Sequence, residues 1–282
     1  MEIKEKFREL SEEKEGAYMA HIYYGDPNEE FSLSQIETLV KHGADFIEFG
    51  IPFSDPTADG AIFQAACERA LRNGITPPKC IQGIKKLREN LDVPIIVTTY
   101  YNIPYIAGVK AFLSGIKEAG AQGIIVPDVS LEEANPLLDA GREVGIHVIF
   151  QVTPLTTEAR IRRIAAAASG FLYVVNVEGV TGARESLADS TLKLVNRVRK
   201  HSDIPIMAGF GISKKEHAAA VVSAGADGVI TGSALGEIYQ KNLENPEETL
   251  PKIARFARQI KQGCIEGYIR RLNAQNISYE EV

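Results

Sequence analysis

The chain has 282 residues, of which 45% are hydrophobic and 24% are charged, and its formal net charge at pH 7 is −6. This composition is typical of a soluble globular protein with a sizeable core, and the negative charge argues against a general nucleic-acid or anionic-membrane binder. Cys67, Cys80 and Cys264 lack metal-ligand or redox spacing, and no signal segment or membrane-spanning run is evident. We therefore expect a cytoplasmic protein.

Short apolar runs alternate with longer amphipathic stretches along the chain. Eight runs have the length and composition of buried strands, namely 17–23, 44–50, 94–99, 122–127, 146–151, 171–177, 205–208 and 227–231. Helical patterns lie between them, for example at 31–42, 109–119 and 214–224, and a glycine follows each as a C-terminal stop. Residues 2–14 predict an extra N-terminal helix and residues 249–272 a closing helix, whereas the polar stretch 273–282 is expected to be loose.

Eight alternating β–α units favour an α/β fold, specifically a (β/α)8 TIM barrel with an extra N-terminal helix, over an open doubly wound sheet. A recurring Gly-Ala-Asp/Gln junction at 43–45, 120–122 and 225–227 resembles a worn internal repeat, which fits a barrel. No linker is evident, so residues 1–282 are expected to form a single domain. Chemistry in such a barrel lies at the C-terminal ends of the strands.

Residues 47–60, Ile-Glu-Phe-Gly-Ile-Pro-Phe-Ser-Asp-Pro-Thr-Ala-Asp-Gly, contain the strongest functional signal. Glu48 lies near the end of a buried run, and Asp59 lies on the irregular loop that follows. Two carboxylates in unlike environments suit acid–base chemistry, because one group must gain a proton while another loses one. The alternative is that Glu48 pairs with a neighbouring base and that Asp59 caps a helix at 60–72.

Two glycine clusters, at 209–213 and 232–235, follow the last two predicted strands. Small residues let a phosphate approach the backbone, and barrels often bind phosphate at this corner, although ordinary turns also use glycine. Neither cluster contains Lys or Arg, so binding is expected through backbone N–H groups and hydroxyls. The segment 178–190 is long for a β–α connection, which favours a lid loop over a plain link.

The five histidines are dispersed and predict no metal site. His42, His201 and His217 are expected on helix surfaces. His21 differs, because it lies in the first predicted strand. It is either a satisfied core histidine or a residue that points into the mouth of the barrel.

In order along the chain, these segments resemble the tryptophan synthase alpha chain family. The matching motifs are Gly25-Asp26-Pro27, 47–60, Tyr101-Asn102, Pro127-Asp128, 179–182, 209–213 and 232–234. The resemblance implies a (β/α)8 barrel that cleaves indole-3-glycerol phosphate to indole and glyceraldehyde 3-phosphate. It also implies no cofactor in this chain, and a pyridoxal-phosphate-dependent beta chain that receives the indole in an α2β2 complex.

The resemblance further implies roles for individual residues. Glu48 corresponds to the general acid/base that protonates the ring carbon bearing the glycerol chain, and Asp59 to the carboxylate that stabilises charge at the indole N–H. Thr181 corresponds to a lid residue that contacts Asp59 when the lid closes. Substrate-binding residues are expected at His21, Tyr100, Tyr173, Thr181, Gly182, Phe210, Gly211, Gly232 and Ser233.

The chain departs from the family pattern mainly around the pocket. His21 replaces an aromatic or apolar residue that touches indole, and Thr98 replaces a common Leu or Met. Ala61 and Ser130 replace prolines, and the C-terminus is longer. Two alternatives therefore stay open: a regulatory subunit that binds a phosphorylated ligand without turnover, and a related barrel acting on a different phosphorylated substrate, the latter motivated by His21, Tyr24 and Thr98.

Overall fold

The computed structural model describes residues 1–175, 189–209 and 211–280. Within this part of the chain, the strands form one parallel sheet in the order β5-β4-β3-β2-β1-β9-β8-β7-β6. The strands are β1 (Ala17–Tyr23), β2 (Phe46–Gly50), β3 (Ile95–Thr98), β4 (Gly123–Ile125), β5 (His147–Ile149), β6 (Gln151–Val152), β7 (Leu172–Val175), β8 (Ile206–Gly209) and β9 (Gly228–Thr231). The predicted α/β barrel is confirmed.

The predicted fifth strand, 146–151, is wrong in one respect, because it is divided into β5 and β6 at Phe150. β5 pairs with β4, and β6 pairs with β7. The carbonyl of Phe150 itself accepts a hydrogen bond from the Tyr173 amide at 3.0 Å. Because β5 and β6 are consecutive in the chain, the barrel closes through this interrupted strand rather than through a continuous ladder.

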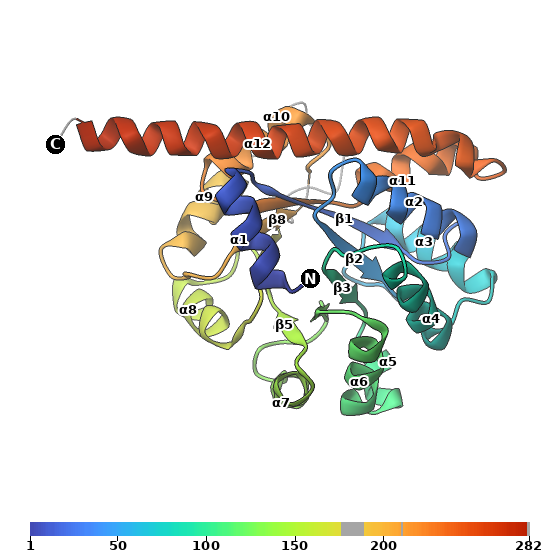
Figure 1. The fold of residues 1–282 in the computed structure, drawn as a ribbon. Helices are drawn as coiled ribbons and strands as arrows, with labels where there is room; N and C mark the ends of the chain where they lie inside the picture. Colours follow the sequence, from blue (N-terminus) through green and yellow to red (C-terminus); the bar gives the residue numbers. More distant parts are fainter. Residues whose placement is uncertain (176–188, 210, 281–282) are drawn as a thin grey trace.

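Helices surround the strands (Figure 1). They are α1 (Ile3–Glu13), α2 (Glu29–Lys41), α3 (Ala61–Arg72), α4 (Pro77–Arg88), α5 (Asn102–Ala107), α6 (Val109–Ala119), α7 (Asn135–Val144), α8 (Glu158–Ala167), α9 (Asp189–Arg199), α10 (Lys215–Ser223), α11 (Ser233–Tyr239) and α12 (Leu250–Glu280), with 3-10 turns η1 (Gln240–Asn242) and η2 (Pro246–Thr249). The three helices predicted at 31–42, 109–119 and 214–224 correspond to α2, α6 and α10, and the N-terminal helix to α1.

The closing helix is longer than predicted. α12 runs along α10 and α2 and continues to Glu280, so the expectation that 273–282 is loose is wrong for residues 273–280 (Figure 1). That stretch is polar but contains neither Gly nor Pro, so nothing in it breaks a helix. Lys261 joins α12 to the segments that precede β1 and β2 through ion pairs with Glu15 at 2.9 Å and Asp45 at 2.8 Å.

Side chains of the strands alternate between two cores. Met19, Phe46 and Ile96 belong to the cluster inside the barrel, whereas their neighbours in the sequence face the surrounding helices. α1 lies across one end of the strands and adds Ile3, Phe7 and Leu10 to the inner cluster (Figure 1). Because α1 closes this end, the opposite end of the barrel is left for a ligand.

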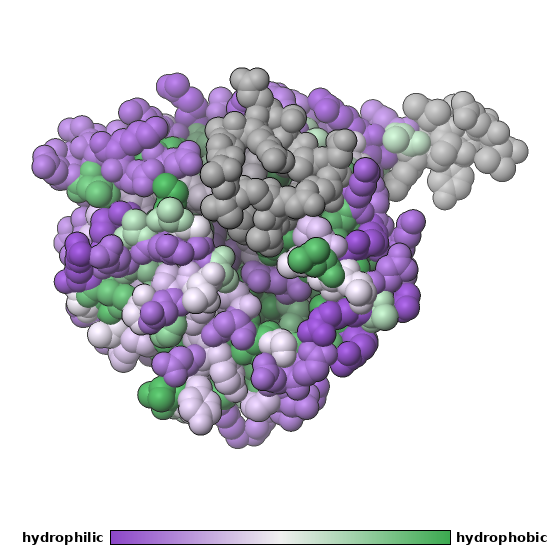
Figure 2. All heavy atoms as spheres, turned by 180° about the vertical axis from the view of Figure 1, so that it is seen from behind, coloured by the Kyte–Doolittle hydropathy of each residue, from purple (hydrophilic) through white to green (hydrophobic). Residues whose placement is uncertain are grey.

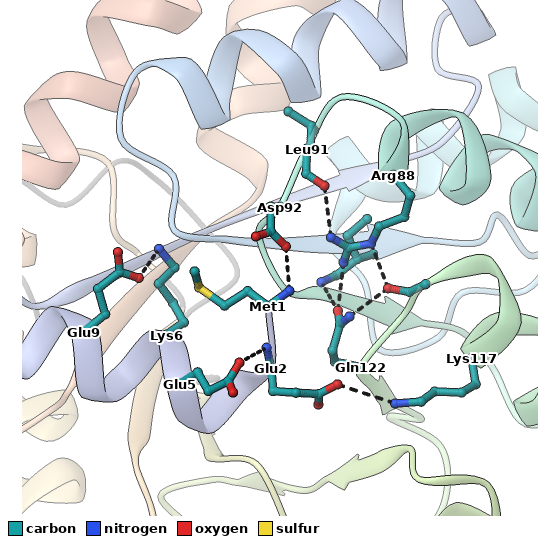
Figure 3. A network of polar contacts seen from close by, with 12 residues as sticks. Met1, Glu2, Glu5, Lys6, Glu9, Arg88, Leu91, Asp92, Lys117 and Gln122 are labelled. Atoms are coloured by element: carbon teal, nitrogen blue, oxygen red, sulfur yellow. Dashed lines mark hydrogen bonds and ion pairs between the residues drawn. The ribbon is translucent and has the colours of Figure 1, made fainter.

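A polar network holds the start of α1 in place (Figure 3). Arg88 donates to the Gly120 carbonyl and to Gln122 Oε1, both at 2.9 Å. Glu2 and Lys117 approach within 3.7 Å beside this network. The N-terminal ammonium of Met1 also donates to Asp92 Oδ1 at 2.6 Å, so the N-terminal segment is tied to α6 and to the loop before β3.

The surface opposite α1 is largely hydrophilic, with apolar residues scattered in small groups (Figure 2). In the described part of the chain, no helix has both the length and the apolar character that crossing a membrane requires.

Candidate active site

Three inward-facing residues meet near the C-terminal ends of β1, β2 and β3. His21, Glu48 and Thr98 each lie two residues beyond a member of the inner cluster and are buried. The parallel register places His21 directly beside Glu48, and Thr98 beside Gly50. The alternation of strand side chains therefore builds this group from three separate segments of the sequence.

The two oxygens of Glu48 have different surroundings. Oε1 accepts a hydrogen bond from Thr98 Oγ1 at 2.6 Å and lies 3.4 Å from His21 Nδ1. Oε2 is buried and has no hydrogen-bond partner among the described residues. Burial raises the pKa of Glu48 to about 8, with a smaller contribution from the charge of Asp59, while the Thr98 hydrogen bond opposes the shift. At neutral pH the carboxyl group is protonated, and Oε2 carries the proton because Oε1 is the acceptor.

His21 is a neutral imidazole in this pocket. Burial lowers its pKa to about 3, so its contact with Glu48 is not an ion pair. Its ring packs against Phe63, with ring centroids 4.4 Å apart, and against Tyr23 at 5.2 Å. Nε2 is buried and has no partner in the described part of the chain, so the alternative of a satisfied core histidine is wrong. The imidazole points into the barrel mouth.

Asp59 is fixed by two phenols. Its Oδ2 accepts hydrogen bonds from Tyr23 at 2.6 Å and from Tyr100 at 2.7 Å, while the Tyr100 hydroxyl accepts from the Ala58 amide at 3.1 Å. Burial raises the pKa of Asp59, and both phenol hydrogen bonds oppose that shift. α3 begins at Ala61, after Gly60 as its N-cap. The alternative in which Asp59 caps this helix is therefore wrong.

Tyr173 lies on β7, buried inside the barrel. Its pKa is raised well above the usual value, first by burial and then by the charges of Glu48 and Asp59, so the hydroxyl stays protonated. A Cβ on Gly209 would lie 2.7 Å from the Tyr173 oxygen, so this position requires glycine. Tyr173 therefore lies near both acids and packs against Gly209, the first residue of the first glycine cluster.

The second glycine cluster lies directly beside His21. A Cβ on Gly232 would lie 2.6 Å from Phe63 and 3.6 Å from the His21 Cβ. Gly211 has a φ of +74°, and no atom lies within 4 Å of the position its Cβ would take. Ser233 is exposed at the first position of α11. The corner after β8 and β9 therefore offers open space beside the Gly211 backbone and an exposed hydroxyl at Ser233, whereas the missing side chain of Gly232 makes room for Phe63.

The structure brings together most residues that the sequence predicted. Glu48, Asp59, His21, Tyr100 and Tyr173 surround one end of the barrel, with the two glycine clusters beside them. Thr181, Gly182, Phe210 and the lid predicted at 178–190, except its last two residues, lie outside the described residues.

Sequence reasoning missed Tyr23 and Phe63. Tyr23 could have been found, because it lies two residues beyond His21 on the same face of β1. Tyr24 is a correction in the other direction, since its hydroxyl donates to Glu29 at 2.9 Å and its ring stacks on Phe49 outside the barrel. It does not line the pocket.

His217 is a further correction. It is buried rather than on the helix surface, and its Nδ1 lies 2.9 Å from the Gly211 carbonyl. Nδ1 also lies 3.4 Å from the Ser213 amide nitrogen, so His217 contacts the loop after β8 at two positions. A single polar residue in a helix does not show which face carries it. His42 and His201 are partly exposed. In the described ranges, no group of His, Cys, Asp and Glu is arranged to hold a metal ion.

The fold and site together define a (β/α)8-barrel enzyme with a buried, protonated carboxylic acid, a second carboxylate held by phenols, and an open glycine corner. Comparison with known proteins is specific about the family. The family model described as tryptophan synthase alpha chain matches residues 7–265.

Relatives and solved structures agree. The tryptophan synthase alpha chain of Methanocaldococcus jannaschii is 46% identical over 86% of each chain, and that of Methanosarcina mazei is 45% identical over 94% of each. The crystal structure of tryptophan synthase subunit alpha from Legionella pneumophila str. Paris has a TM-score of 0.85 at 31% identity and covers 93% of this chain and 97% of that one. The chain belongs to the tryptophan synthase alpha chain family, whose members catalyse the indole-3-glycerol-phosphate lyase reaction and need no cofactor.

Burial of Glu48 predicts a stability effect. Its pKa rises from 4.5 to about 8 on folding, so folding takes up a proton at neutral pH. This opposes folding increasingly as pH rises from the unfolded to the folded pKa. Glu48→Gln should therefore raise the free energy of unfolding at pH 7 by on the order of 3 kcal/mol, with a gain near zero at about pH 4.

Urea unfolding at the two pH values measures this difference. Glu37→Gln, at an exposed position on α2, is the matched control and should change stability by less than about 0.5 kcal/mol. A Glu48→Gln variant that is less stable than wild type at pH 7 would contradict the protonated, desolvated carboxyl group.

Proposed function

We propose that this chain, acting as one barrel domain, cleaves indole-3-glycerol phosphate to indole and glyceraldehyde 3-phosphate, with Glu48 as the general acid/base. The observation that carries this proposal is the buried carboxyl group of Glu48 with its unpartnered Oε2, and burial raises its pKa to about 8. Cleavage of the carbon–carbon bond requires a proton on the ring carbon that bears the glycerol chain. A carboxylic acid kept neutral by burial can supply that proton near neutral pH.

Asp59 is proposed to stabilise the positive charge that develops at the indole N–H. Tyr23 and Tyr100 both occupy Oδ2, which holds the carboxylate in one orientation. A preorganised charge stabilises the transition state without having to reorient during the reaction. Tyr173, buried near both acids, is proposed to line the space for the ring, and Thr181 to contact Asp59 from the lid.

The phosphate is proposed to bind at the corner formed by Gly211, Gly232 and Ser233, together with Gly182 and Phe210. Open space at Gly211 and the exposed Ser233 hydroxyl support this placement. His217 supports it indirectly, because its hydrogen bond to the Gly211 carbonyl fixes the loop. The substrate would then extend from the two acids at one end to the glycine corner at the other.

The contacts of Thr98 and His21 argue against the two alternatives. A subunit that only binds a ligand has no need of a buried acid, which costs folding energy. A different ring or sugar was motivated by polar residues in the pocket. However, the Thr98 hydroxyl donates a hydrogen bond to Glu48, and His21 Nδ1 also faces Glu48. These two residues therefore orient the carboxyl group of Glu48, and their polar atoms are not evidence that the pocket binds a ring other than indole.

Removing the acid tests the proposed reaction. Glu48→Gln should lower kcat/KM for indole release about 10²–10⁴-fold, because the amide cannot donate an acidic proton. Binding of glycerol 3-phosphate, followed by calorimetry, should persist, since the glycine corner is untouched. Glu37→Gln should match wild type. Near wild-type indole release from Glu48→Gln would refute the assignment of the acid.

The pKa of Glu48 predicts the alkaline limit of activity. Because the protonated form is the acid, kcat/KM should fall about tenfold per pH unit above about pH 8. Thr98→Val removes the hydrogen bond that lowers this pKa, so its alkaline limb should move to higher pH. A rate independent of pH from 7 to 10, or a limb that moves downward in Thr98→Val, is inconsistent with Glu48 as the acid.

The partner is proposed to be a tryptophan synthase beta chain that contains pyridoxal phosphate and receives indole in an α2β2 complex. Solved structures of tryptophan synthase from M. tuberculosis contain a chain similar to this one, with 30% identity and a TM-score of 0.83 for the open form. Large apolar side chains are exposed on segments that follow β3 and β6, namely Tyr105 (66%), Ile106 (76%) and Leu155 (92%). Apolar residues exposed near the reactive end of the barrel are suited to a protein interface. The reaction is proposed to take place in the cytoplasm, and the free thiols of Cys67, Cys80 and Cys264 support this, because thiols stay reduced there.

Charge substitution on this surface tests the interface. Ile106→Glu and Leu155→Glu should each weaken association with a tryptophan synthase beta chain at least about tenfold in analytical ultracentrifugation, because a buried unpaired charge opposes docking. Leu71→Glu, at the far end of α3, is the control and should bind as wild type does. Unchanged association in both variants would place the interface elsewhere.

A further inference from the structure

We propose that His21 relays the proton of the substrate hydroxyl to Glu48 Oε1 while Glu48 Oε2 gives its own proton to the ring carbon. This inference rests on the proposed lyase function and assigns a route to the second proton that the reaction must move. In this arrangement the carboxyl group of Glu48 acts as an acid through one oxygen and is reprotonated through the other.

The first supporting observation is the asymmetry of the carboxyl group. Thr98 Oγ1 donates to Oε1 at 2.6 Å, and His21 Nδ1 lies 3.4 Å from the same oxygen. Oε2 has no partner among the described residues. The oxygen that faces His21 is therefore the acceptor, and the other oxygen is free to lose its proton. One group performs both tasks without rotating.

The second observation is the position of the imidazole between the acid and the glycine corner. Nδ1 faces Glu48, while the Cβ of His21 lies 3.6 Å from where a Gly232 side chain would begin. A substrate that spans from Glu48 to this corner places its glycerol chain along the imidazole. Nε2 is buried and unpartnered in the described part of the chain, so it is available to the hydroxyl next to the ring.

The step balances without a further reactant. The ring π pair takes the Oε2 proton and forms the new C–H bond. The hydroxyl proton moves to Nε2, its O–H pair becomes the C=O bond of the aldehyde, and the C–C bonding pair returns to the ring. The Nδ1 proton moves to Oε1. Glu48 and His21 both end neutral, with their protons on the other oxygen and the other nitrogen, and exchange with water in the opened site resets them.

The burial of His21 favours passing a proton from one ring nitrogen to the other over holding an extra proton as an imidazolium ion. Its pKa is lowered to about 3, so an imidazolium ion in this pocket is strongly disfavoured. A ring that accepts at one nitrogen as it donates from the other never becomes charged. The nearby hydroxyls of Tyr23 and Tyr173 have pKa values raised well above normal, so they stay protonated and cannot take the proton as bases, while Asp59 Oδ2 is occupied by two phenols.

Substitution of His21 tests this role. His21→Phe and His21→Gln should each lower kcat for indole release about 10²-fold, at the lower end of general acid–base effects, while KM stays within about threefold. In His21→Ala, added imidazole should restore part of kcat. The matched control, 1-methylimidazole, accepts a proton but has no N–H to pass on, and should restore none.

The outcomes separate this inference from the proposed function. If wild-type protein releases no indole from indole-3-glycerol phosphate, the lyase function itself fails. If wild type is active and His21→Phe and His21→Gln keep wild-type kcat, the relay is overturned. Equal rescue by the two imidazoles, or rescue by neither, also overturns it. Glycerol 3-phosphate binding by each variant shows that the barrel is folded, and His42→Gln serves as a surface control.

Discussion

The burial of Glu48 is the constraint on which the rest of the site depends. A carboxyl group inside a barrel is costly in its charged form, so the surroundings decide which form it takes. Here the carboxyl group is buried, and the nearest base is the imidazole of His21, which is desolvated as well. The result is a pair of neutral groups in contact, rather than an ion pair, at the mouth of β1 and β2. A neutral acid at this place serves carbon protonation, whereas an ion pair would suppress it.

The two ends of the barrel have different functions in maintaining this state. α1 closes the end of the barrel away from the acid by adding Ile3, Phe7 and Leu10 to the inner cluster. At the other end, hydrogen bonds to Asp59 and Glu48 set the orientation of each carboxyl group. The two acids thus differ because one is held by phenols at the edge of solvent and the other lies in the apolar interior. Glycine at 209 and 232 leaves room for the aromatic rings between them.

Much of this arrangement follows from the sequence, and the failures have physical causes. Apolar runs between helical patterns were enough to place β1, β2, α6 and the general barrel order. The interruption at Phe150 could not be seen, because residues 146–151 are one continuous apolar run and the break depends on pairing with two different neighbours. Likewise, polar composition at 273–280 suggested disorder where the helix merely continues outward.

In the site, too, local features could be predicted from the sequence, whereas contacts between distant segments could not. The two acids were recognisable from a single segment, since their spacing and the Pro- and Gly-rich turn are local features. The bond from Thr98 to Glu48 and the contact of His21 with the same oxygen join segments about 25 to 50 residues apart, and they exist only in one strand register. The inward position of Tyr23 follows from the alternation along β1, but its hydrogen bond to Asp59 on the loop after the next strand does not.

The interrupted strand also bears on how this barrel can vary. β5 and β6 stand at the two ends of the strand order, whereas β1, β2 and β3 lie next to one another within it. An insertion or deletion near Phe150 therefore alters the wall where the ladder is already discontinuous, and the pairing that aligns His21 with Glu48 is left intact. The discontinuity between β5 and β6 lies opposite β1, β2 and β3. The length of the chain there can therefore change during evolution while the surroundings of Glu48 on β2 stay the same.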